Sequence, residues 1–380
     1  MKQSDHKFSD YFLIGLFLII LFSAFIQQAT KIIPETPNQE NRKLADEPVF
    51  AVNLLDPFPA AYEKYYNDHF VFRNHFVNWY AQISFNWFGI SPYPEKVIIG
   101  KNNQLYLVPN ELDTYQCKNL LTEAEITIIR KEFIHRNAYY SGKGVDYYMV
   151  ICPTKYSVYP EYLPWFVRPD GDVNRTDQFI KVVRETGVEV VDLRKALLQA
   201  KDSVGDKLFW PTDNHWSELG AFLGYQEIIR QIQKKHPEVE MLKFGDFDIR
   251  PFDRTGGNLA SMLNMQNKLR DSRYKFIQLY KNMTSMIQPC PFPFPQGIDK
   301  GEYFRGFEMQ SDSLPHLLFI HDSFGKLIHP FMKDSFSRSV FIWDNWQYKV
   351  NEPIVEAENP DICVTMTLES LIGGLIKNIN

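Results

Sequence analysis

Five short apolar segments, separated by stretches with helical periodicity, constrain the fold of this 380-residue chain more than any other feature. Each is rich in β-branched or aromatic residues. They are residues 146–152, 188–193, 316–321, 339–343 and 361–367. The helical stretches between most of them are 122–140, 175–185, 193–200, 217–233 and 325–332. Nearly continuous apolar strands that alternate with helices indicate an α/β fold, with a mainly parallel sheet covered on both faces.

A longer apolar segment lies near the start of the chain. Residues 11–30 carry no charge, and about 20 helical residues span the ~30 Å hydrocarbon core of a bilayer. The sequence from Phe25 to Ala29 lacks the small-residue pattern of a signal-peptidase site. This favours an uncleaved transmembrane signal anchor over a cleaved signal peptide. We expect residues 1–10 to be a cytoplasmic tail and the remainder to be exported.

The rest of the chain is divided by composition. Residues 31–57 are rich in Pro, Asn, Glu and Lys, which is typical of an extended linker. Residues 58–92 predict a helical extension, in which Phe76, Trp79, Ile83 and Trp87 form one apolar face before Gly89 ends the pattern. Residues 244–315 fit the strand–helix alternation poorly and predict an insertion beside the site. We expect residues 58–380 to form one elaborated domain.

Charge and motif content narrow the classes of function. The 41 Lys and Arg residues are outnumbered by 46 Asp and Glu residues, so the net charge is −5. Such a chain has no basic field to hold a nucleic-acid backbone, and we expect no nucleic-acid partner. Neither a G-x-G-x-x-G sequence nor a P-loop occurs. We therefore expect no cofactor.

The four cysteines divide into two pairs by their surroundings. Cys152 and Cys363 lie in strand-like apolar segments, which predicts buried free thiols. Cys117 and Cys290 lie in loop-like sequence and are the better candidates for a disulfide in an exported domain. The spacing of the cysteines and histidines does not suggest a zinc site.

Two loops carry residue types that suit acyl transfer. Asp213 and His215 lie two residues apart just before a predicted helix, so the carboxylate can hold the Nδ1 proton and leave Nε2 as a general base. Ser323 follows an apolar strand and begins a turn that contains Gly325. A serine at a helix start also offers its own backbone N–H to an oxyanion. Together the two loops predict a nucleophile, a base and an orienting acid.

Simpler interpretations of the same residues stay open at this point. Asp-x-His is also a helix cap followed by a solvated histidine, and Asp-Ser before a helix is also an ordinary N-cap. A metal site is the weaker alternative. Two pairs of a carboxylate and an imidazole, each without a third ligand at a suitable spacing, are weak evidence for a metal. The four residues are Asp213, His215, His321 and Asp322. We expect no metal. The other histidines have no partner at a useful spacing: His69, His75, His135, His236 and His329.

The motifs also resemble a known family. Asp213-Asn214-His215-Trp216 followed by Gly220-Ala221, and later Asp322-Ser323-Phe324, resemble the alginate O-acetyltransferase family, which comprises AlgJ/AlgX-type, SGNH-hydrolase-like proteins, and the related DHHW group. Four further segments are similar to that family in the same order, at residues 41–45, 65–73, 97–106 and 153–160. The resemblance runs from about residue 41 to the C-terminus.

The resemblance implies a three-layer α/β/α domain, attached to the inner membrane by a single span and exposed on its periplasmic side. It implies transfer of acetyl groups to hydroxyls of an exported polysaccharide. Ser323 would be the nucleophile, His215 the base and Asp213 its orienting partner. Because one span cannot carry acetyl groups across a bilayer, the resemblance also implies a multi-span membrane O-acyltransferase as the acetyl supplier.

Two departures from the family pattern and three nearby residues add candidates for the site. His321 stands where small residues commonly precede Asp-Ser, and Asn258 stands where the family often has Asp. Asn258 is a candidate oxyanion donor. Lys155 is either a substrate contact or a loop residue with structural hydrogen bonds. Trp216 is a candidate for stacking on sugar rings, as are Trp210, Trp343 and Trp346, although core packing is favoured for at least half of these. Asp322 is also a candidate.

The main hypothesis is a polysaccharide O-acetyltransferase that works through a serine acyl-enzyme. Two alternatives remain. A glycan acetyl-esterase would use the same three residues with water as the acceptor, and a glycan-binding or assembly subunit would not use them at all.

Overall fold

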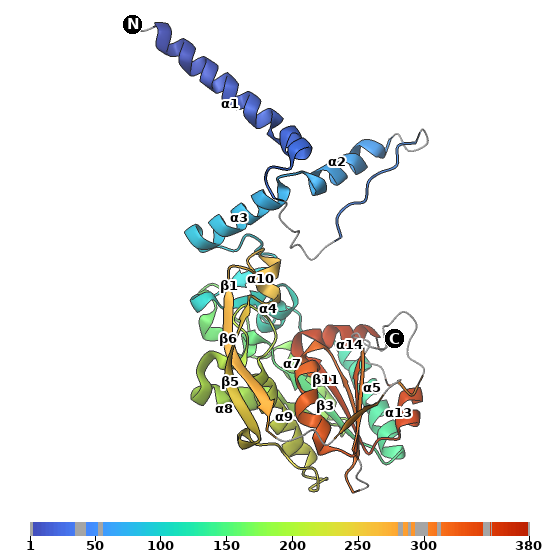
Figure 1. Cartoon of the computed structure of the whole chain (residues 1–380). Helices are drawn as coiled ribbons and strands as arrows, with labels where there is room; N and C mark the ends of the chain where they lie inside the picture. Colours follow the sequence, from blue (N-terminus) through green and yellow to red (C-terminus); the bar gives the residue numbers. More distant parts are fainter. Residues whose placement is uncertain are drawn as a thin grey trace. The chain divides into compact units, whose positions relative to one another are not determined.

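The structure is a computed structural model of the chain (Figure 1). It describes residues 3–34, 43–51, 56–279, 284–287, 290–292, 303–309, 313–344, 350 and 352–378. The contacts divide the chain into two compact units. The first comprises Met1–Tyr93 and Ala260–Gln266, and the second comprises Pro94–Leu259 and Asn267–Asn380. Each unit is considered separately below.

The second unit is built on a seven-stranded sheet with the order β4-β3-β11-β9-β10-β8-β7. The strands are β3 (Asp146–Cys152), β4 (Glu189–Asp192), β7 (Ser285–Ile287), β8 (Phe304–Glu308), β9 (His316–His321), β10 (Arg338–Trp343) and β11 (Ile362–Leu368). The neighbouring strands from β4 to β10 pair in parallel, and β8 and β7 continue the sheet with antiparallel pairing. The five parallel strands coincide with the five apolar segments of the sequence, which confirms the α/β fold.

Side chains alternate between two cores, one on each face of this sheet. Along β3, Tyr148 and Val150 pack in one core with helices α8 (Leu193–Val204) and α9 (Glu218–Ile232). Tyr147, Met149 and Ile151 pack in the other core. That second core is formed with helices α5 (Glu123–Gly142), α7 (Arg175–Arg184), α13 (Glu352–Glu358) and α14 (Ile372–Asn378). A strand has a side-chain period of two, so a strand that is apolar throughout needs helices on both faces. The three-layer arrangement follows.

The parallel register brings the carboxyl ends of the central strands together. His321 at the end of β9 pairs with Trp343 on β10 and with Met366 on β11. The helix expected at 325–332 is replaced by two short pieces, the 3₁₀ helix η6 (Ser323–Leu327) and α12 (His329–Met332). Pro330 lies in the first turn of α12, where its missing N–H is tolerated, but it cannot continue a longer helix.

The segment 244–315 is divided between two structures. Strands β5 (Phe247–Thr255) and β6 (Arg270–Gln278) form a separate antiparallel pair, and helix α10 (Asn258–Met262) lies between them in sequence. By contrast, β7 and β8 extend the main sheet. Most of the Pro- and Phe-rich stretch at 289–295 lies outside the described residues.

Up to Tyr93, the described residues of the first unit form three helices. Helix α1 (Gln3–Thr30) is long and apolar enough to cross a membrane between Asp10 and Thr30. The helical stretch expected at 58–88 is two helices, α2 (Phe58–His69) and α3 (Arg73–Phe88). Gly89 ends α3 as predicted, with a left-handed φ of 63°. Much of the linker expected at 31–57 lies outside the described residues.

The cysteines follow the prediction in part. All four are free thiols, and both Cys152 and Cys363 are buried as expected. Cys117 and Cys290, the better candidates for a disulfide, are not joined to each other in the structure. The Sγ of Cys117 lies 3.4 Å from the Gly171 carbonyl, and the Sγ of Cys290 lies 3.5 Å from the Phe292 carbonyl, so each thiol has its own local partner.

A pair of glycine substitutions tests the packing around α9. A Cβ on Gly220 would collide with the backbone carbonyl of Leu208, so we expect Gly220→Ala to lower the free energy of unfolding by about 1–3 kcal/mol. Gly142→Ala, at the end of α5, meets no atom within 4 Å and is the matched control. It should be neutral or slightly stabilising. Thermal unfolding of the full chain measures both, and equal effects would contradict this packing.

Candidate active site

The strand ends and the loop before α9 bring three polar side chains together. His215 Nδ1 lies 2.8 Å from Asp213 Oδ1, and His215 Nε2 lies 2.9 Å from Ser323 Oγ. A carboxylate can only accept a hydrogen bond, so Nδ1 carries a proton and donates a hydrogen bond to Asp213. In the neutral ring Nε2 then accepts from the Ser323 hydroxyl. The structure thus joins residues that lie 108 positions apart in the sequence.

Asp213 is buried but held as a carboxylate. Burial acts to raise its pKa, but the side-chain and backbone hydrogen bonds from His215 and the charge of Arg254 together hold the pKa well below its usual range. Arg254 Nη2 donates to Asp213 Oδ2 at 3.1 Å, and the Asn258 backbone N–H donates to the same oxygen at 3.3 Å. A Cβ on Gly257 would lie 2.5 Å from this oxygen. The Gly256-Gly257 sequence therefore gives the acid space to sit against the backbone.

Arg254 is a site residue that the sequence did not reveal. Its guanidinium lies 3.8 Å from the centre of the Trp210 ring and also contacts the buried carboxylate of Asp271. These contacts fix the guanidinium beside Asp213. Its position immediately before the Thr-Gly-Gly-Asn segment was the only local hint.

The turn that carries Ser323 is fixed on two sides. Asp322 Oδ1 accepts from the Phe324 N–H at 2.9 Å and caps η6, while its Oδ2 accepts from the Leu368 N–H at 2.7 Å at the end of β11. The indole N–H of Trp216 donates to the Phe324 carbonyl at 3.1 Å. The backbone N–H of Ser323 has no hydrogen bond to another described residue, so it is available to an oxyanion.

Three of the predicted substrate candidates have structural roles instead. Asp322 and Trp216 are fully buried, so neither the carboxylate nor the indole ring can reach a sugar. Lys155 is also fully buried, and its Nζ donates to the carbonyls of Leu105, Trp210 and Pro211 at 2.6–3.0 Å. These three bonds use all of its donors. Burial lowers the pKa of Lys155 to about 7, against the opposing charges of nearby carboxylates.

Asn258 lies at the site through its backbone. Its side chain is exposed and makes no hydrogen bond to a described residue, so its role as an oxyanion donor stays a prediction. Of the other tryptophans, Trp210 is buried under Arg254, and Trp343 is partly buried beneath Lys326 at 3.8 Å. Trp346 lies outside the described residues.

His321 supports the turn from below and has an unexpected partner. Its Nδ1 lies 2.6 Å from the Asp322 carbonyl, and its Nε2 lies 2.7 Å from His329 Nε2. A carbonyl only accepts, so Nδ1 carries the proton, and His329 must then donate from its Nε2. The description of His329 as a lone histidine is wrong, and so is that of His236, which lies 2.8 Å from Asp146.

Glu111 is a second residue that the sequence did not reveal. It is buried, and its Oε1 accepts from the Asn214 side chain at 3.1 Å, next to the triad histidine. Burial raises the pKa of Glu111 to about 8, against the hydrogen bond of Asn214. This group is therefore protonated over much of the neutral range.

The alternative metal site does not assemble. His321 and Asp322 bind His329 and backbone groups, as described above, while Asp213 and His215 face Ser323. In the part of the chain that the structure describes, no group of three His, Cys, Asp or Glu side chains has the arrangement to hold a metal ion.

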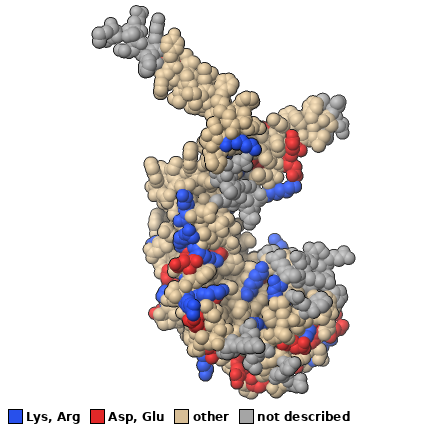
Figure 2. All heavy atoms as spheres, viewed as in Figure 1, with Lys and Arg blue, Asp and Glu red and all other residues tan. Residues whose placement is uncertain are grey.

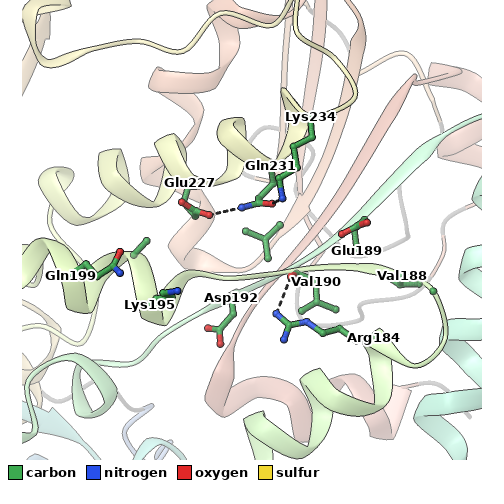
Figure 3. A pocket seen from close by; sticks show the side chains of 13 residues that line it. Arg184, Val188, Glu189, Val190, Asp192, Lys195, Gln199, Glu227, Gln231 and Lys234 are labelled. Atoms are coloured by element: carbon green, nitrogen blue, oxygen red, sulfur yellow. Dashed lines mark hydrogen bonds between the residues drawn. The ribbon is translucent and has the colours of Figure 1, made fainter.

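A large pocket lies elsewhere on the second unit. It runs along the edge strand β4 and is lined by charged residues of α7, α8, α9 and the turn after α9, among them Arg184, Lys195, Glu227 and Lys234 (Figure 3). Asp213, His215 and Ser323 do not line it. The pocket is therefore not the entrance to the triad.

Comparisons with known proteins agree with this fold. Residues 97–288 match the family described as SGNH hydrolase-like domain, acetyltransferase AlgX. Bacillus cereus PatB1 has a similar structure, with a TM-score of 0.54, 14% identity and coverage of 72% of this chain and 96% of that one.

Two curated relatives are named probable alginate O-acetylase AlgJ. The Azotobacter vinelandii protein is 28% identical over 162 residues, which is 42% of this chain and 39% of that protein. The Pseudomonas aeruginosa protein is 26% identical over 194 residues, which is 50% of this chain and 46% of that protein. The chain thus spans less than half the length of these curated relatives. The match over half of its residues, with the α/β fold around Asp213 and His215, shows that the chain belongs to the AlgX family of SGNH hydrolase-like acetyltransferases.

Proposed function

We propose that this protein is an O-acetyltransferase that moves an acetyl group through an acyl-enzyme on Ser323 to a hydroxyl of an exported polysaccharide. The observation that carries the proposal is the continuous hydrogen-bonded series Asp213–His215–Ser323, at 2.8 and 2.9 Å. The names of the AlgJ relatives support acetylation of a polysaccharide.

In the first half-reaction, Ser323 Oγ attacks the acetyl carbonyl while His215 Nε2 takes the hydroxyl proton. The charged imidazolium is stabilised by Asp213, which stays ionised beside Arg254. The Ser323 backbone N–H is the proposed hydrogen-bond donor to the oxyanion. When the tetrahedral intermediate collapses, the bond to the donor's leaving group breaks and His215 returns its proton to that group.

In the second half-reaction, a sugar hydroxyl attacks the acetyl-serine. His215 takes the hydroxyl proton, the ester bond to Ser323 breaks, and the proton passes to Ser323 Oγ. The acetyl ester of the sugar leaves and the free serine is restored. No redox step and no further cofactor is needed for this exchange.

The proposed setting is the periplasmic side of the inner membrane. Helix α1 would be an uncleaved single-pass anchor, because it is long and apolar enough to span a bilayer. A single span offers no path for acetyl groups, so a multi-span membrane O-acyltransferase is the proposed acetyl supplier.

Acetylation of the nucleophile tests the mechanism. Incubation of the full chain with an activated acetyl ester should add the mass of one acetyl group at Ser323, detected by mass spectrometry of peptides. Ser323→Ala should abolish the adduct and lower turnover by about 10³-fold or more. Ser141→Ala, an exposed serine of α5, is the matched control and should keep both. An adduct that persists in Ser323→Ala would contradict the proposed nucleophile.

The acceptor distinguishes transfer from the two alternatives. Added oligosaccharides should gain acetyl esters in proportion to the acetyl lost from the enzyme. Release of acetate alone across a wide panel would identify an esterase. A folded protein that binds glycan but forms no adduct would be a binding or assembly subunit.

Arg254 should position the acid of the triad. Arg254→Gln removes the partner of Asp213 Oδ2, and we expect kcat to fall about tenfold, or about 1.4 kcal/mol, with a smaller change in KM. Arg250→Gln is the matched control, because Arg250 lies on the same strand but pairs with Asp248 at the surface. Equal effects of the two substitutions on kcat would exclude this role.

The histidine pair predicts how stability depends on pH. Burial, opposed by the hydrogen bond to the Asp322 carbonyl and aided by the nearby charge of Lys326, lowers the pKa of His321 to about 4. The unfolded chain then binds more protons than the folded one between about pH 6.5 and 4. Neutral His321 therefore contributes stability above about pH 6.5, and this contribution is lost as the pH falls toward 4, by up to about 1.4 kcal/mol per pH unit.

Denaturant unfolding at several pH values measures this slope. His321→Gln should flatten it, whereas His135→Gln, an exposed histidine of α5, should leave it unchanged. Parallel slopes for the native chain and His321→Gln would show that the buried pair does not titrate in this range.

A further inference from the structure

Helix α3 exposes its apolar face. Phe76, Trp79, Tyr80, Ile83 and Trp87 follow one another at spacings of one to four residues along one side of the helix, and all five are exposed. The exposed fraction reaches 60% for Trp79 and 81% for Trp87. The buried residues of α3 are Ala81 and Ser84. This order is the reverse of an ordinary surface helix, which buries its large apolar side chains.

Aromatic contacts link part of this face to neighbouring rings. The rings of Phe76 and Trp79 lie 6.0 Å apart, and Phe76 also contacts the rings of Phe70 and Phe72 at 6.3 and 6.1 Å. Contiguous apolar surface of this kind marks a site of protein or membrane interaction. Tryptophan and tyrosine are the residues that concentrate at the boundary between lipid and water.

The charges of α3 also suit a lipid surface. The helix contains Arg73 and no acidic residue. Figure 2 shows mainly uncharged atoms along α3. The absence of carboxylates from α3 removes repulsion from the anionic headgroups of a membrane.

Helix α3 lies close in the sequence to the helix that is long enough to span a membrane. Only 27 residues, 31–57, separate the last residue of α1 from the first residue of α2, and α3 follows directly. Even when fully extended, a segment of this length reaches at most about 95 Å. If α1 spans the membrane, the bilayer surface is therefore always present at high effective concentration.

We infer that α3 docks on the bilayer surface through this aromatic face and holds the start of the catalytic unit against the membrane. The inference rests on the proposed anchoring by α1. Its occupant is the headgroup region of the membrane, in which Trp79 and Trp87 are inserted and the opposite side of α3 stays with the protein.

Quenching of tryptophan emission by brominated lipid tests the inference in the full chain. Helix α1 contains no tryptophan, so the anchor itself gives no signal. The full chain is reconstituted into vesicles of phosphatidylethanolamine and phosphatidylglycerol, with part of the lipid replaced by phosphatidylcholine brominated high on its acyl chains. We expect emission to fall. Most of this loss should disappear in the double variant W79F/W87F and should remain in W165F, an exposed tryptophan of the second unit.

A second variant disturbs docking without removing the reporters. Ile83→Asp places a carboxylate in the centre of the face and should remove most of the quenching of Trp79 and Trp87. Ile134→Asp, at an exposed isoleucine of α5, is the matched control and should not.

Flotation of the same vesicles separates the two levels of the inference. Protein that floats while the native chain and W79F/W87F are quenched equally would overturn docking and leave the anchor intact. Cross-linking between copies through α3, with its tryptophans unquenched, would assign the face to a second copy and overturn the inference. Failure to float would overturn both the anchor and the docking.

Discussion

The hydrogen bond from the Trp216 indole to the Phe324 carbonyl joins the two loops on which the candidate triad depends. Trp216 is the residue after His215, and Phe324 is the residue after Ser323, so the bond fixes the base and the nucleophile relative to each other. Helix α9 makes room for the indole, since a Cβ on Gly224 would lie 2.9 Å from its ring. The positions of the glycine, the tryptophan and the two catalytic candidates therefore depend on one another through close packing.

A buried polar network surrounds this junction. Lys155 donates to the Leu105 carbonyl and to two carbonyls of the loop just before Asp213. Asp271 accepts hydrogen bonds from both Thr212 and Arg254. Such groups are costly to bury and are stable only when they are bonded. The bonded groups hold Asp213 in one position. Preorganised polar groups of this kind favour charge separation at the histidine without later rearrangement.

Much of the fold and the triad could be predicted because their signals are local. Each parallel strand is a continuous apolar segment, and Asp213 and His215 lie two residues apart, next to a helix start. Burial and long-range pairing leave no such signal. Lys155, Trp216 and Asp322 have the chemistry of substrate contacts, and only the packed structure shows that they are enclosed. Arg254 and His329 were missed because their partners lie on other turns or strands.

The exposed aromatic face of α3 meets a chemical requirement of the proposed reaction. Water competes with the sugar hydroxyl for the proposed acetyl-serine, so a short interval between acetyl delivery and transfer limits hydrolysis. The 27 residues between α1 and α2 are long enough for Ser323 to move away from the membrane surface, where the proposed membrane-embedded donor would act. A second contact through α3 restricts that freedom without adding a further span. The aromatic face, which contributes nothing to the core, thereby gains a physical reason to be exposed.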